Sequence, residues 1–80
     1  MSRAPEVILY TRPDCHLCEL AAQMLEECAV TCFEVDIESD LALIRKYGMH
    51  IPVLYRADID RELCWPFNSE TVLSFVDLEI

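Results

Sequence analysis

Glycine is nearly absent from this chain of 80 residues, which contains only one. Glycine adopts left-handed turns more readily than any other residue, so a loop-rich protein stapled by disulfides is not expected. The five cysteines are an odd number and cannot all pair within one chain. These features favour a protein that keeps its thiols in a reducing compartment, and we expect it to be cytoplasmic.

Basic residues are also scarce. Six Lys and Arg stand against fifteen Asp and Glu, for a net charge of −9. This charge repels phosphate backbones and anionic lipid surfaces, so neither a nucleic acid nor a membrane is expected as a partner. No apolar run approaches the roughly 20 residues that a membrane span requires. The N-terminal stretch lacks the features of a signal peptide. We also expect the protein to be a monomer.

The sequence does contain enough apolar residues for a core, because 54% of them are hydrophobic. The length fits one domain, residues 1–80. A continuous apolar run at residues 7–10 predicts a central strand. From Cys15, apolar residues recur at steps of three and four and predict an amphipathic helix. The residues expected on its inner face are Leu17, Leu20, Ala21, Met24, Leu25 and Cys28.

The middle of the chain contains a second strand and a second helix. Residues 31–37 alternate with a period of two, which indicates a strand near the edge of a sheet. Phe33, Val35 and Ile37 are expected to point from it towards the core. Ser39 is predicted to cap the following helix and Gly48 to end it.

The last third of the chain predicts a hairpin and a helix. Residues 50–56 and 61–65 have the pattern of two strands around a turn, and Asn68 or Ser69 is expected to cap a last helix. The order is β-α-β-α-β-β-α, with two β-α-β passages that imply right-handed crossovers. We therefore expect an α/β fold, a mixed four-stranded sheet packed with three helices.

The most informative motif is C-x-x-C, formed by Cys15 and Cys18 between the first strand and the first helix. A structural zinc site needs about four ligands, and Cys28 with Cys32 resembles a second pair. Cys18 and Cys28, however, are ten residues apart on one helix, a separation of roughly 15 Å that one ion cannot bridge. No metal site is therefore predicted within a single chain.

A redox-active pair fits this position better. The unpaired backbone N–H groups at the start of a helix stabilise a thiolate at Cys15. Cys18 lies one turn later and towards the apolar face of the helix, so Cys15 is the expected nucleophile and Cys18 the resolving thiol. Asp14 either opposes the thiolate or caps the helix. The alternative is that both cysteines are structural thiols, as we expect for the three remaining ones.

The stretch YTRPDCHLC after a strand, with HIPVLY further on, resembles a glutaredoxin of the thioredoxin-fold superfamily over residues 6–78. The resemblance implies a thioredoxin-like fold and a cis bond before Pro52, which faces the cysteines. It implies that the Ile51 backbone pairs with an extended substrate. It also implies that Arg12 meets a glutathione carboxylate and that Tyr10 belongs to the substrate-binding surface.

Two departures from the glutaredoxin pattern are visible. His16 and Leu17 stand between the cysteines, where these proteins usually have Pro-Tyr. The usual Gly-Gly turn before the last helix is missing, and the segment CWPFNSE places Trp65 at that wall of the groove. The chain therefore resembles short glutaredoxin-like proteins that keep C-x-x-C and Ile-Pro without the glycine turn.

Cys64, beside Trp65, is expected to be partly exposed and open to glutathionylation or dimer formation.

These observations predict a thiol–disulfide oxidoreductase that reduces protein disulfides or glutathione mixed disulfides through Cys15 and Cys18. No bound cofactor is expected; glutathione is a candidate co-substrate, and a thiol or a reductase supplies electrons. A second hypothesis is a non-catalytic peptide-binding module whose groove beside Pro52 is lined by Trp65 and Phe67. A third is an iron–sulfur or zinc carrier in which two chains share a metal through Cys15.

Overall fold

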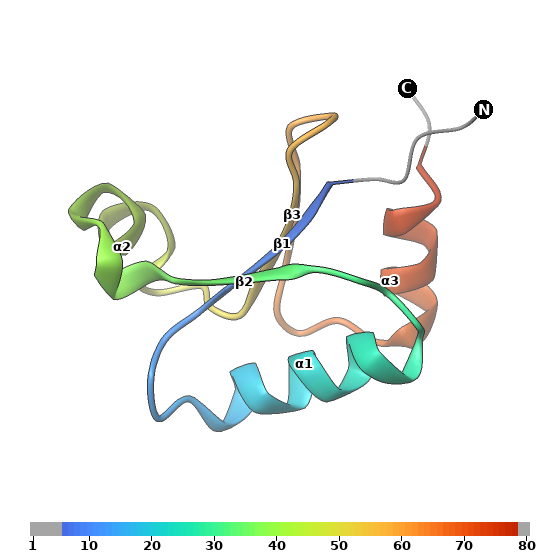
Figure 1. The fold of residues 1–80 in the computed structure, drawn as a ribbon, viewed down its shortest axis with the longest axis horizontal. Coiled ribbons are helices and arrows are strands. Elements are labelled where there is room, and N and C mark those ends of the chain that lie inside the picture. The colour runs from blue at the N-terminus through green and yellow to red at the C-terminus, as the bar shows by residue number, and fades with distance from the viewer. Residues whose placement is uncertain (1–5, 79–80) are drawn as a thin grey trace.

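The computed structural model describes residues 6–78, which form strands and helices in the predicted order (Figure 1). The elements are β1 (Val7–Thr11), α1 (His16–Glu27), β2 (Phe33–Asp36), a short 3-10 helix η1 (Ile37–Ser39), α2 (Leu41–Tyr47), β3 (Val53–Arg56), β4 (Arg61–Cys64) and α3 (Ser69–Val76). None of the helices in this described part is both long and apolar enough to cross a membrane.

The strands form one mixed sheet in the order β2-β1-β3-β4. β1 runs parallel to β2 and antiparallel to β3, and β3 runs antiparallel to β4. This sheet and its three helices make the thioredoxin-like fold that the sequence predicted. The expected second crossover was wrong, because β2 and β3 lie on opposite sides of β1 and run antiparallel to each other. Only β1-α1-β2 joins parallel neighbours.

Each face of the sheet carries a hydrophobic cluster, because successive strand residues point to opposite sides. On one face the sheet packs against α1 and α3, which also contact each other (Figure 1). The buried residues there are Val7, Leu9, Ala21, Leu25, Leu54, Phe67, Val72 and Phe75. A smaller cluster of Ile37, Tyr47 and Val53 joins η1, α2 and β3. β1 contributes to both clusters, because Val7 and Leu9 belong to the larger one and Tyr10 packs against the smaller one.

The inner face of α1 differs from the predicted one. Cys18, Ala21 and Leu25 are buried, whereas Leu17 and Leu20 are 43% and 39% exposed. Both sets of residues have the three- and four-residue spacing of a helix face, so the pattern alone allows either. The sheet selects the set that includes Cys18, so the prediction that this cysteine faces the apolar side is confirmed, whereas the inward position of Leu17 and Leu20 was wrong.

The segment around β2 also differs in detail from the prediction. β2 is an edge strand, as predicted, but Phe33 is 74% exposed instead of pointing inward. Ile37 is buried, although it belongs to η1 and not to the strand. Asp40 caps α2 by accepting the N–H of Ala42 at 2.8 Å. Ser39 does not cap α2, because the 3-10 turn includes it and delays the start of the helix.

The end of the chain follows the prediction. β3 and β4 form the hairpin around residues 57–60. Asn68 caps α3, because its Oδ1 accepts the N–H of Thr71 at 2.9 Å. Thr71 Oγ1 in turn accepts the N–H of Asn68 at 2.9 Å, which completes a capping box. Gly48 ends α2, as predicted, with a φ of −53° that any residue can adopt.

Candidate active site

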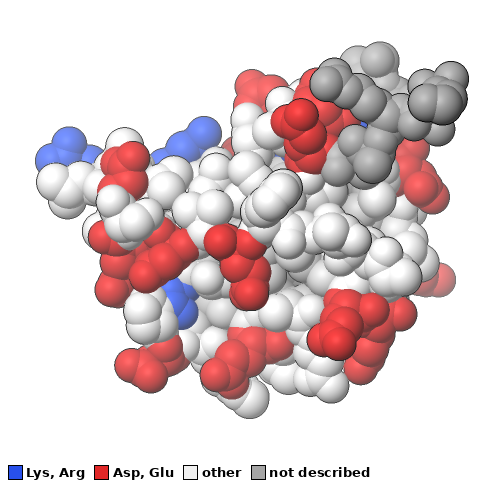
Figure 2. All heavy atoms as spheres, viewed as in Figure 1, with Lys and Arg blue, Asp and Glu red and all other residues white. Residues whose placement is uncertain are grey.

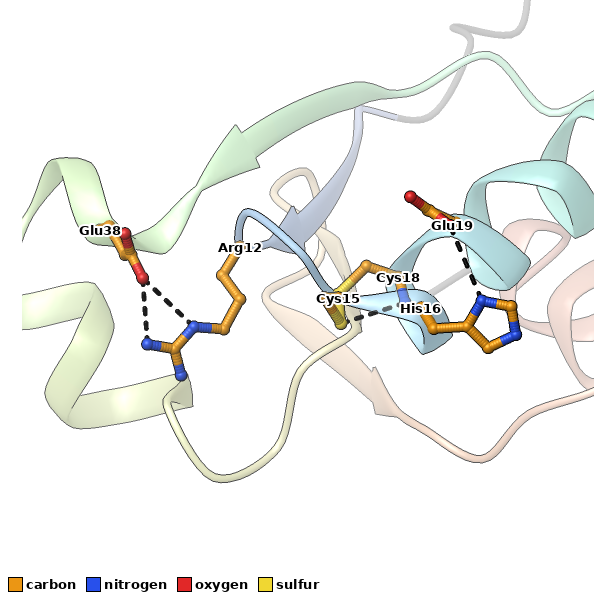
Figure 3. The surroundings of a disulfide bond; sticks show 6 residues. All are labelled: Arg12, Cys15, His16, Cys18, Glu19 and Glu38. Atoms are coloured by element: carbon orange, nitrogen blue, oxygen red, sulfur yellow. Dashed lines mark hydrogen bonds and ion pairs between the residues drawn. A yellow bond between two sulfur atoms is a disulfide. The ribbon is translucent and has the colours of Figure 1, made fainter.

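The two cysteines of the motif lie where β1 ends and α1 begins. In the turn between these elements Asp14 adopts a left-handed conformation with a φ of 57°, and Cys15 is the N-cap of α1. Sγ of Cys15 accepts the backbone N–H of Cys18 at 3.2 Å (Figure 3). Cys15 therefore caps the helix itself, and Asp14 does not. A donor aimed at the sulfur stabilises negative charge on it.

Cys15 and Cys18 form a disulfide, with their Cα atoms 5.2 Å apart. Their environments differ, because Cys15 is half-buried whereas Cys18 is only 4% exposed, on the inner face of α1. A partner in solution can therefore reach Cys15 more easily than Cys18. This asymmetry agrees with the roles of nucleophile and resolving thiol, which stay predictions.

A hollow of about 270 Å³ lies beside this disulfide. It is formed by the turn after β1, the beginning of α1 and one residue of β2. Its lining residues are Thr11, Arg12, Pro13, Asp14, Cys15, Cys18, Glu19, Ala22 and Glu34. One arginine and three carboxylates are among them, so the hollow has an acidic rim.

The Arg12 side chain points away from the disulfide (Figure 3). Its Nη2 and Nε donate to Oε2 of Glu38 at 3.0 and 3.3 Å, and the two side chains are 41% and 44% exposed. On the other side of the cysteines, His16 Nδ1 lies 3.7 Å from the Glu19 carboxylate. Arg12 thus lines the hollow with its guanidinium already paired, and its role in binding a substrate stays a prediction.

The other predicted binding residues do not line this hollow. The Ile51–Pro52 bond is cis, as the resemblance implied, but Pro52 is buried and its carbonyl accepts the N–H of Trp65 at 3.1 Å. Tyr10 stacks on Tyr47 with 4.6 Å between ring centroids, and Ile51 packs against the same cluster. Tyr10 and Ile51 thus pack in the smaller hydrophobic cluster, and their contacts with a substrate stay predictions.

Two tyrosines and one cysteine have pKa values raised by burial. Burial raises the pKa of Tyr47 above its ordinary value, and a hydrogen bond with Glu62 raises it further. Burial also raises the pKa of Tyr10. The pKa of the Cys32 thiol is raised by burial and by the nearby Glu34 carboxylate. The charged residues that line the hollow beside the disulfide are Arg12, Asp14, Glu19 and Glu34.

Trp65 lies at a different hollow. Its ring meets that of Phe67 edge-on, with 5.0 Å between centroids. With Leu20 and Met24 of α1 it lines a space of about 320 Å³. Phe67 is only 7% exposed and belongs to the core, so the prediction that it lines an open groove beside Pro52 was wrong. An aromatic side chain gains more from burial in the core than from lining a solvent-filled groove.

The remaining cysteines have the predicted environments. Cys28 and Cys32 are half-buried and pack against the main core, whereas Cys64 is exposed. Within residues 6–78, no group of three or more His, Cys, Asp or Glu is arranged to hold a metal ion.

Glu38 is a residue of the site that no sequence pattern indicated, because it is 26 positions from Arg12. The pairing of β1 with β2 explains the contact. Thr11 lies opposite Asp36 in this parallel pair, so the residues that follow the two strands come together. The sequence predicted both strands but not their register, and only the register brings Arg12 and Glu38 into contact.

Comparison with known proteins gives one family and several solved structures. The family model described as "Glutaredoxin-like domain (DUF836)" matches residues 6–77. The chain is similar to the X-ray structure of the structural genomics target protein XcR50 from X. campestris, with 39% identity over 92% of this chain and 99% of that one, and a TM-score of 0.84. No curated protein matches the chain.

Two solution structures are also similar. That of XcR50 has 38% identity, covers 94% of this chain and 96% of that one, and gives a TM-score of 0.82. That of protein Ne2328 from Nitrosomonas europaea has 25% identity, covers 94% of each chain and gives a TM-score of 0.71.

Proposed function

The chain belongs to the glutaredoxin-like domain family, and from this premise we propose that it is a thiol–disulfide oxidoreductase that reduces protein disulfides or glutathione mixed disulfides. One observation supports this function above the others. The Cys15–Cys18 disulfide stands at the start of α1 with one cysteine half-buried and the other buried. A dithiol that first attacks a partner and then closes on itself needs this division of access.

In the proposed reaction the thiolate of reduced Cys15 attacks one sulfur of the partner's disulfide. That bond breaks, a mixed disulfide forms on Cys15, and the first partner sulfur leaves as a thiolate. Cys18 then loses its proton and attacks Sγ of Cys15, which forms the intramolecular disulfide and releases the second partner sulfur. Two electrons pass from the protein to the partner, whose thiolates take up protons. The product is the disulfide form described above.

The contacts around the two sulfurs support this division of roles. The N–H of Cys18 donates to Cys15 Sγ at 3.2 Å and favours a thiolate at that sulfur. Cys18 is buried against the sheet but only one helical turn from Cys15. It is therefore poorly placed to meet a partner and well placed to resolve a mixed disulfide on Cys15.

The proposed setting follows the sequence-based expectations. We propose that the chain acts as a monomer in the cytoplasm without a bound cofactor, and that a thiol or a reductase restores the dithiol. Glutathione is a candidate co-substrate. Of the residues predicted to contact a partner, Arg12 is the one that lines the hollow at the disulfide, so we retain it as the proposed contact for a carboxylate that displaces Glu38.

Equilibration in graded glutathione redox buffers tests the proposed couple. After acid quenching, cleavage after glutamate separates the cysteines, because both cysteines of the motif fall in fragment 7–19, Cys28 and Cys32 in 28–34 and Cys64 in 63–70. We expect fragment 7–19 to lose two hydrogens reversibly, with a definable midpoint. If it stays a dithiol across the whole range, the oxidoreductase proposal fails and a peptide-binding module becomes the better explanation.

Single-cysteine variants test the assignment of roles. Cys15→Ser should reduce the rate of disulfide reduction by about 10³-fold or more, because the nucleophile is lost. Cys18→Ser should instead accumulate a mixed disulfide on fragment 7–19. Cys64→Ser is the matched control, since it removes an exposed thiol on β4, and its rate should equal that of the wild type. A Cys18→Ser variant that traps no partner would contradict the two-step scheme.

A further inference from the structure

Arg12 is the only Lys or Arg among the residues that line the hollow at the disulfide. A partner with a carboxylate near its own disulfide would need this guanidinium. The guanidinium, however, is directed away from the sulfurs and bound to Glu38 through two N–H donors, at 3.0 and 3.3 Å (Figure 3). An incoming carboxylate must therefore displace Glu38 before it can pair with Arg12.

The position of Glu38 is fixed by the backbone. Its N–H donates to Oδ1 of Asp36 at 2.8 Å, which caps η1. This bond does not involve the Glu38 side chain, so Gln at position 38 keeps the cap. Because the side chains of Arg12 and Glu38 are 41% and 44% exposed, their ion pair is solvated and can be opened without unfolding the site.

The remaining charged residues of the hollow are acidic. Asp14, Glu19 and Glu34 line it, and the whole chain has a net charge of −9. Figure 2 shows Asp and Glu side chains gathered around most of the visible face, with few basic atoms among them. With Arg12 neutralised by Glu38, the field at the disulfide repels anions and attracts cations.

We propose that Glu38 is a specificity residue that occupies Arg12, so that the preferred partner is a disulfide flanked by basic side chains and not one flanked by carboxylates. The inference rests on the proposed oxidoreductase function and names the substrate class of that site. Glutathione carries two carboxylates, so its mixed disulfides belong to the disfavoured class unless the protein attached to them supplies the basic residues.

The test uses single-turnover kinetics, which need no electron donor. Reduced protein, freed of reductant, is mixed with an excess of one of two disulfide peptides that differ only in Lys or Glu beside the cysteines. The rate constant for oxidation of the dithiol is read from fragment 7–19 after acid quenching. At low salt we expect the Lys peptide to react about tenfold faster than the Glu peptide. The preference should shrink at roughly 1 M salt, where the Debye length is about 3 Å.

Variants then test whether Glu38 acts through Arg12. Glu38→Gln should raise the rate constant for the Glu peptide up to about fivefold, because Arg12 becomes free to pair with it. In an Arg12→Gln background the same change should have less than about a twofold effect, since only the general field is altered. Glu26→Gln, an exposed carboxylate on α1 about 16 Å along the helix from Cys15, is the control with the same change in charge.

The outcomes separate this inference from the proposed function. If both peptides oxidise the protein at equal rates, or the Glu peptide is faster, the specificity inference is overturned while the oxidoreductase stands. If Glu38→Gln acts equally with and without Arg12, the role assigned to their ion pair is overturned. If neither peptide oxidises the dithiol at any salt concentration, the proposed function fails and the inference fails with it.

Discussion

Two arginines stand at opposite ends of the central strand pair. Arg12 follows β1, is substantially exposed and bonds one exposed carboxylate. Arg56 ends β3 at the side where β1 begins and is 5% exposed. Its guanidinium donates to the carbonyls of Phe75 and Leu78, at 3.1 and 2.6 Å, and to the Asp58 carboxylate at 2.6 and 3.2 Å.

These two arginines show that one residue type serves two purposes in this fold. Arg56 ties β3, the hairpin turn and the end of α3 together, and a buried guanidinium with several acceptors cannot leave without stranding them. Arg12 has solvent around it and one partner that water can replace. The Arg56 end of the sheet is built for stability, and the Arg12 end keeps a charge that can change partners beside the disulfide.

The largest expected effect concerns Arg56. Arg56→Met should lower the free energy of unfolding by about 2–4 kcal/mol, because the Phe75 carbonyl loses its buried donor. The matched Arg12→Met should lower it by less than about 1 kcal/mol, since exposed ion pairs contribute little. Urea denaturation followed by the fluorescence of Trp65 measures both. Equal losses would remove the distinction between the two ends.

A smaller effect is expected for Asp58→Asn, because Arg56 keeps its bonds to the two carbonyls. The hydrogen bond from Arg56 holds the pKa of Asp58 below its ordinary value of 3.8. A lowered pKa stabilises the folded protein above the ordinary value, and this stabilisation is lost as the pH falls through the folded pKa. The difference in unfolding free energy between wild type and variant should therefore shrink below pH 3.8.

The control for this pH experiment is Glu26→Gln, which removes an exposed carboxylate on α1. Stability curves of both variants are measured by urea denaturation at a series of pH values. A difference between wild type and Asp58→Asn that stays constant through the acid range would show that the Arg56–Asp58 bond does not control this titration.

The smallest expected effect concerns Glu38. Glu38→Gln should change the free energy of unfolding by less than about 1 kcal/mol at low salt. Added salt should reduce even this difference, because it screens exposed charges. The measurement is urea denaturation at two salt concentrations. A loss as large as that of Arg56→Met would mean that the Arg12–Glu38 pair is structural and would weaken its assignment to specificity.

Much of the fold can be predicted from residues that are close together in the sequence. The apolar run at residues 7–10 and the change of period at the C-x-x-C motif predict β1, α1 and a junction with two cysteines. The hairpin and the Asn68 cap of α3 follow from neighbouring residues in the same way. Such features depend on side chains within a few positions of one another, so a single sequence is enough to find them.

Other predictions were wrong because the features concerned depend on segments far apart in the chain. Leu17 has the spacing of the apolar helix face but is 43% exposed, whereas its neighbour Cys18 is buried, as predicted. Phe33 alternates correctly for a strand but is 74% exposed on the edge strand β2. The direction of β3 is set by its pairing with β1, which no local pattern around residues 50–56 reveals.

The order of the elements and the position of the C-x-x-C motif follow from the sequence, because strand, helix and cap preferences act between near neighbours. Which distant residues the two arginines contact follows only from the tertiary structure. Arg12 meets Glu38 through the register of β1 and β2, and Arg56 meets Phe75 through the packing of α3. Charge and burial at a site depend on distances in space, and distances along the chain do not fix them.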